Sequence, residues 1–75
     1  MIYYSSFSPN FPYEQCKELY KINEYLVQPN GLEFDKLIEG LKGNFWAVCD
    51  NDNNLMGCIY FEIRDNNWYL SGFSK

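Results

Sequence analysis

The chain has 75 residues, of which 47% are hydrophobic and 20% aromatic, and it carries a formal net charge of −4 at pH 7. A chain of this length buries only about 60% of its unfolded surface, so its stability depends on large buried side chains or on a partner. The six lysine and arginine residues do not cluster, and this argues against nucleic-acid binding, which needs a basic stripe to meet the phosphates. We expect a single domain over residues 1–75.

The acidic residues number ten, and in the first half of the chain they alternate with lysines. This pattern is typical of the solvated face of a helix. Mimicry of nucleic acid by an acidic surface is the alternative interpretation, and it predicts binding that collapses with added salt.

Neither a charged leader with an apolar core nor an apolar run of about 18 residues is present, so we expect no signal peptide, no membrane span and a cytoplasmic protein. Cys16, Cys49 and Cys58 form no CxxC motif, which favours reduced, buried thiols over a disulfide framework. A reactive cross-strand pair of Cys49 and Cys58 is the alternative. We expect no metal site, because the chain has no histidine and no paired ligand spacing.

The first half of the chain predicts a strand followed by two helices. Residues 1–7 are rich in aromatic side chains and favour a strand. A helix is expected over residues 12–26, with Pro12 near its first position and Ser8 or Asn10 as its cap. The Gln-Pro-Asn-Gly sequence of residues 28–31 predicts a break between this helix and the next. The second helix has one apolar stripe and glycines near its end, and these residues are Phe34, Leu37, Ile38, Leu41, Gly40 and Gly43.

From Asn44 onward the pattern becomes that of strands. Residues 45–49 and 55–63 flank a polar turn, and a loop at Asn53-Asn54 would place Cys49 opposite Cys58. A second loop at Asn66-Asn67 would place Glu62 opposite Ser71. The sequence therefore predicts an α+β fold in the order β-α-α-β-β-β, with two helices on one face of an antiparallel meander.

A family resemblance rests on the second half of the chain. FWAVCD at residues 45–50, a polar turn and LMGCIYFE at residues 55–62 resemble the second and third strands of the GNAT acetyltransferase fold, and residues 68–73 would be its fourth strand. The leading strand and two helices also fit that family. The resemblance covers the whole chain but only the N-terminal half of the GNAT fold, and hairpins of this kind occur in many folds.

The resemblance implies acyl transfer from acetyl-CoA, but this half lacks the parts that perform it. GNAT enzymes hold the cofactor pyrophosphate on a Q/R-x-x-G-x-G/A loop at a helix N-terminus, and no two glycines of this chain form a G-x-G arrangement. We therefore expect no cofactor in this chain, with acetyl-CoA bound only if another segment supplies the missing half. The isolated chain is not expected to be an enzyme.

The resemblance also suggests two catalytic candidates. Glu62 is a carboxylate inside a predicted strand, where a glutamate of the family often orders water as a general base, and Ser71 occupies the strand on which the base more often sits. The alternative for Glu62, which base rates for charged strand residues favour, is an exposed position on the sheet.

Two functional hypotheses follow from the sequence. The first is a GNAT-like fragment or degenerate relative that transfers an acyl group only when another segment completes it. The second is a non-catalytic binding or structural module, for example a phage or mobile-element protein, that binds a protein partner or associates with itself through its last strand. The interface residues expected on that strand are Trp68, Tyr69, Leu70 and Phe73.

Overall fold

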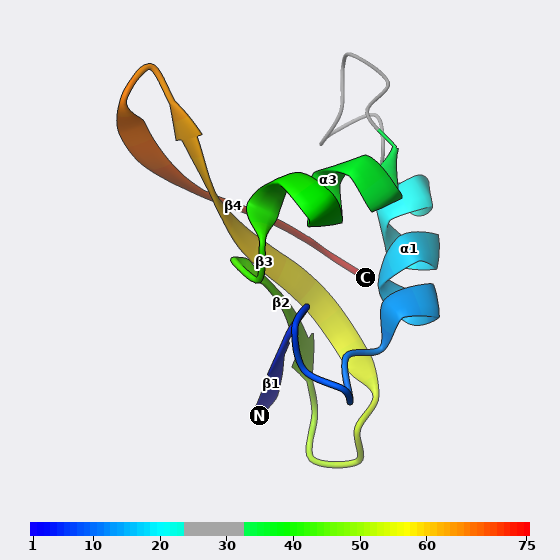
Figure 1. Cartoon of the computed structure of the whole chain (residues 1–75). Coiled ribbons are helices and arrows are strands. Elements are labelled where there is room, and N and C mark those ends of the chain that lie inside the picture. The colour runs from blue at the N-terminus through cyan, green and yellow to red at the C-terminus, as the bar shows by residue number, and fades with distance from the viewer. Residues whose placement is uncertain (24–32) are drawn as a thin grey trace.

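The structure is a computed structural model, and it describes residues 1–23 and 33–75. The described residues form four strands and two helices. In chain order these are β1 (Ile2–Ser5), α1 (Tyr13–Ile22), α3 (Phe34–Leu41), β2 (Phe45–Cys49), β3 (Leu55–Arg64) and β4 (Asn67–Ser74). The strands make one antiparallel sheet in the order β1-β2-β3-β4, and both helices lie on the same side of it (Figure 1). The predicted α+β class and element order are confirmed.

Helix α1 begins directly after Pro12, which lacks the backbone N–H that a first helical turn leaves unpaired. The predicted cap is wrong, because no side chain caps the helix and the Ser8 hydroxyl instead accepts a hydrogen bond from the backbone N–H of Asn10. The helix ends at Ile22. The remainder of the predicted helix, residues 24–26, and the predicted breaker at residues 28–31 lie outside the described residues.

Helix α3 ends where the backbone turns left-handed. Lys42 has φ of 49° and Gly43 has φ of 87°, so the chain leaves the helix through two residues of positive φ. The glycine is required twice over, since a Cβ at Gly43 would also lie 2.8 Å from the ring of Phe7. The predicted glycine stop is therefore found at Gly43.

Both hairpins differ in register from the prediction by two residues. Trp46 pairs with Ile59 rather than with Phe61, and Glu62 pairs with Tyr69 rather than with Ser71. The second turn consists of Asp65 and Asn66. A shift of two residues keeps side chains on their predicted faces, because strand side chains alternate with a period of two. The β2–β3 register shifts again beside the turn, where an irregularity between Val48 and Cys49 pairs Cys49 with Leu55.

The core lies between the helices and the sheet, and the ring of Phe45 is at its centre. This ring is fully buried, stacks on Tyr60 at 5.6 Å and meets Phe34 and Phe11 edge to face at 5.6 and 6.0 Å. Such ring pairs add to the free energy gained from area burial alone. The buried residues are Cys16, Leu19, Tyr20, Phe34, Phe45, Ala47, Cys49, Leu55, Cys58, Tyr60 and Phe73.

The β3–β4 hairpin extends past both helices (Figure 1). Towards the turn the exposed fractions rise on both faces of β3. They rise from 36% at Ile59 to 59% at Ile63 on the face away from the helices. On the helix face they rise from 4% at Tyr60 to 59% for the side chain of Arg64. The outer half of this hairpin is therefore largely exposed to solvent.

Candidate functional site

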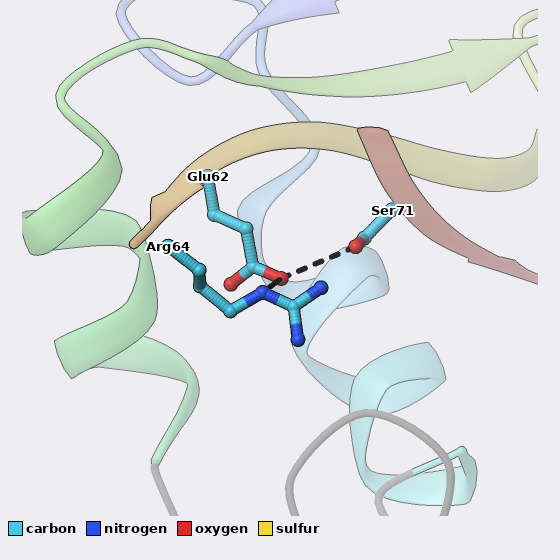
Figure 2. Close-up of polar contacts among 3 residues, drawn as sticks. All are labelled: Glu62, Arg64 and Ser71. Carbon is cyan, nitrogen blue, oxygen red and sulfur yellow. Dashed lines mark hydrogen bonds and ion pairs between the residues drawn. The ribbon is translucent and has the colours of Figure 1, made fainter. Parts of the chain in front are cut away.

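The structure brings the two predicted catalytic residues together. Glu62 on β3 and Ser71 on β4 both point to the side of the sheet that carries the helices (Figure 2). The Ser71 hydroxyl donates a hydrogen bond of 3.3 Å to Oε1 of Glu62. They are diagonal neighbours rather than direct partners, because Ser71 pairs with Tyr60.

Arg64 completes this polar cluster, and sequence reasoning did not single it out. Its Nε lies 3.4 Å from the same Oε1 of Glu62 that accepts the serine hydrogen bond (Figure 2). Its guanidinium also lies 4.3 Å above the ring of Tyr69. A signal was available, since residues two apart on a strand share a face and Glu62 and Arg64 carry opposite charges.

Tyr60 borders the cluster from the core side. Its burial and the carboxylate of Glu62 raise its pKa, against the opposing effects of a hydrogen bond with Ser71 and of Arg64. The phenol therefore stays protonated at neutral pH. A cleft of about 290 Å³ opens on the other side of Glu62, lined by Gly40, Leu41, Asn44, Phe61, Glu62, Ile63 and Trp68.

The geometry of the cluster supports hydrogen bonding more directly than catalysis. One oxygen of Glu62 already serves both Ser71 and Arg64, and the arginine side chain is 59% exposed. An exposed ion pair of this kind adds little to stability, typically less than about 1 kcal/mol. The cluster nevertheless places a carboxylate beside a hydroxyl at the wall of a cleft, which is the minimal arrangement for proton transfer.

The four predicted interface residues divide between two sides of the sheet. Trp68 and Leu70 are exposed, and they lie on the side away from the helices. Tyr69 lies on the helix side under Arg64. Phe73 is 8% exposed and belongs to the core, so it is not part of an accessible surface.

The side of the sheet away from the helices is covered with apolar residues. Phe45, Ala47 and Cys49 of β2 face the core, so the residues between them, Trp46 and Val48, face away from it. Cross-strand pairing places their partners and the alternate residues of β3 and β4 on the same side. We call this surface the open face, and its large side chains are Tyr3, Trp46, Val48, Ile59, Phe61, Ile63, Trp68 and Leu70.

The open face carries no charged side chain in any of the four described strands. Its remaining positions are filled by small residues, namely Ser5, Gly57, Gly72 and Ser74. A sequence signal for this surface existed in β3. Its apolar residues run without polar interruption from Leu55 to Phe61, and such continuous runs are typical of strands covered on both faces.

Comparisons with family models, with curated proteins and with solved structures found no match to this chain. Within residues 1–23 and 33–75, neither helix is long and apolar enough to cross a membrane. The same residues contain no group of three or more side chains arranged to hold a metal ion. The function is therefore argued from the two surfaces of the β3–β4 hairpin.

Proposed function

We propose that this chain is a protein-binding module that packs its open face against another polypeptide. The observation that carries the proposal is the open face itself. Six of its side chains are between 36% and 65% exposed, and they form an uninterrupted apolar surface across the sheet. The largest exposed apolar patch on a monomeric protein is typically about 300–600 Å², and such patches are often interaction sites.

The size of this surface sets the scale of the interaction. Taking about 200 Å² for a fully exposed aromatic side chain and less for an aliphatic one, the six side chains expose roughly 500 Å². Removing that area from water would release roughly 12 kcal/mol of hydrophobic free energy before the entropic cost of association. A covered open face would also supply the second apolar contact that a 75-residue domain needs.

Position-specific photo-crosslinking in the native cells tests this proposal. A photoreactive phenylalanine analogue at position 70 lies on the open face, and the same analogue at Ile22 on α1 is the matched control because that side chain is also exposed, at 71%. We expect a discrete cross-linked product from position 70 and none from position 22. Equal labelling from both positions, or none from position 70, would contradict a binding role for this face.

A second candidate function is supported by the contact between Glu62 and Ser71 at the cleft wall. In this candidate the chain is the acceptor-side half of a GNAT-like acetyltransferase, completed by another segment that binds acetyl-CoA. The described helices do not favour binding of the cofactor, because α1 carries Glu14 in its first turn, and α3 has Glu33 at its N-cap and Asp35 in its first turn. These carboxylates occupy the helix termini that would otherwise attract a pyrophosphate.

Native mass spectrometry with and without acetyl-CoA tests whether this chain alone holds the cofactor. A mass increase of one cofactor on this chain would support the acyltransferase candidate. A chain that stays free of cofactor at millimolar acetyl-CoA would make acyl transfer depend wholly on the other segment, and it would leave the binding module as the function of the isolated chain.

A further inference from the structure

The geometry points to a second copy of this chain as the polypeptide that covers the open face. We infer a face-to-face dimer in which the two sheets pack against each other with their strands reversed. This inference rests on the proposed binding role of the open face and names its partner. Three properties of the face support it: its area, its charge and its shape.

The exposed area matches what a dimer needs. Two open faces would together bury roughly 1,000 Å² of apolar side-chain surface, which is the lower limit for a specific interface. Backbone atoms and the half-buried side chains of Trp46 and Val48 would add to this value. An interface at this lower limit is typical of weak association, so we expect the equilibrium to be visible at micromolar concentrations of the chain.

The distribution of charge permits self-association of an acidic chain. The chain has a net charge of −4, and its acidic side chains in residues 1–23 and 33–75 lie on or beside the helices, in the turns and on the helix side of the hairpin, such as Glu62. The open face itself is uncharged in the four strands, so two copies would bring no like charges into direct contact there. Like charges at a contact would otherwise oppose the pairing of identical surfaces.

The order of large and small side chains along β3 and β4 suits a reversed arrangement of two copies. Large side chains gather at the turn end of the β3–β4 hairpin, namely Phe61, Ile63, Trp68 and Leu70. The opposite end of the same two strands has only Gly57, Gly72 and Ser74 on this face. A two-fold axis across the strands would set the large side chains of one copy over the small residues of the other.

Sheet geometry allows this arrangement. Two twisted sheets pack face to face about 10 Å apart with their strand directions aligned to within about 30°, and identical sheets have the same twist. A two-fold dimer also uses the same patch on both copies, so one surface satisfies both sides of the contact. The helices lie on the far side of each sheet and would not obstruct it (Figure 1).

Sedimentation equilibrium of the full chain from 1 to 500 μM tests the inference. We expect a monomer–dimer equilibrium in which Leu70→Asp raises the dissociation constant by at least tenfold. Ile22→Asp is the matched control and should change it by less than threefold, because this exposed residue of α1 lines a separate cleft with Leu19 and Leu55 on the helix side of the sheet. Circular dichroism confirms that each variant is folded, and Trp68→Ser repeats the test with a milder change if Leu70→Asp does not fold.

Two results would overturn the inference. One is a chain that remains monomeric at 500 μM. The other is a dimer that survives both Leu70→Asp and Trp68→Ser, since that dimer would use another surface, such as the free edge of β4. A monomeric chain that still cross-links through position 70 to a different polypeptide would overturn the second copy as partner while leaving the binding module intact. A monomeric chain that gives no cross-link through position 70 would contradict both the dimer and the binding module.

Discussion

Two thiols from distant parts of the chain meet in the core, Cys16 on α1 and Cys58 on β3, with exposed fractions of 0% and 2%. The hydrogen bond between them, together with burial, raises the pKa of the Cys58 thiol above its ordinary value of 9.0. Burial and the neighbouring Cys16 likewise raise the pKa of Cys49. The thiols of Cys49 and Cys58 are therefore neutral at physiological pH and act as small apolar groups.

The raised pKa of Cys58 predicts a loss of stability in alkaline solution. Below pH 9 the thiol is neutral in both states, so its contribution is fully present; above pH 9 only the unfolded chain ionises, and the contribution is lost. We expect the free energy of unfolding to fall above pH 9 by up to about 1.4 kcal/mol per pH unit for this group. Urea unfolding between pH 7 and 10.5 under reducing conditions measures it.

Cys58→Ala is the control for this dependence. The variant should be less stable at pH 7 because it loses buried volume, but its free energy of unfolding should fall less steeply above pH 9. Equal slopes in the two proteins would show that the Cys58 thiol ionises in the folded state.

The sequence predicted the state of single residues more accurately than the contacts between them. It indicated reduced, buried thiols, and all three cysteines are free and buried. The predicted opposition of Cys49 and Cys58 is wrong, because Cys49 pairs with Leu55 and Cys58 with Ala47. The true neighbour, Cys16, reaches Cys58 through the docking of a helix on a sheet, which no local pattern encodes. Glu62 and Ser71 were each singled out, whereas Arg64 was missed.

Among the elements, the hairpin turns decide the register of the sheet. Asp65 and Asn66 both have positive φ, at 52° and 66°, which is the signature of a two-residue type I′ turn. The adjacent Asn67 is the first residue of β4 and pairs with Arg64. Runs of Asp and Asn offer several two-residue loops of similar quality, and for this reason the sequence did not determine the register of the β3–β4 hairpin. The β2–β3 connection is instead longer, over residues 50–54, and has a register shift beside it that no local pattern indicated.

Substituting each asparagine in turn tests the register. Asn66→Gly should leave the free energy of unfolding unchanged or raise it by up to about 0.5 kcal/mol, because glycine adopts positive φ without strain. Asn67→Gly should lower it by about 0.5–1 kcal/mol, because glycine weakens a strand position. Urea unfolding of both variants measures the difference, and equal effects would favour the loop at Asn66-Asn67 instead.

The elements as a whole were more predictable than their pairing. The apolar stripe of α3, the proline before α1 and the extended runs of β2 and β3 each predicted the observed element. Both registers slipped by two residues, and this error left the faces unchanged because it is a full period of a strand. The sequence prediction did not include the open face, because it assigned the alternating apolar side chains of the strands only to the side that faces the core.

Across the whole molecule, the two sides of the sheet are unequal. One side is packed by α1 and α3 over the aromatic core, and the other presents apolar side chains to solvent in the isolated chain. The charges lie away from the open face, where they keep an acidic chain soluble without interfering with an apolar contact. This separation predicts how association through the open face responds to salt.

Association through an uncharged apolar face should not weaken as salt is added. Raising sodium chloride from 50 to 500 mM screens the repulsion between two chains of net charge −4, so the dissociation constant of the dimer should stay constant or fall up to about threefold. Ammonium sulfate should tighten the dimer further, because it strengthens apolar burial. Sedimentation equilibrium at each salt measures this, with Leu70→Asp as the monomeric control. A dissociation constant that rises tenfold with sodium chloride would instead assign the contact to the acidic surface, because ionic contacts weaken as they are screened.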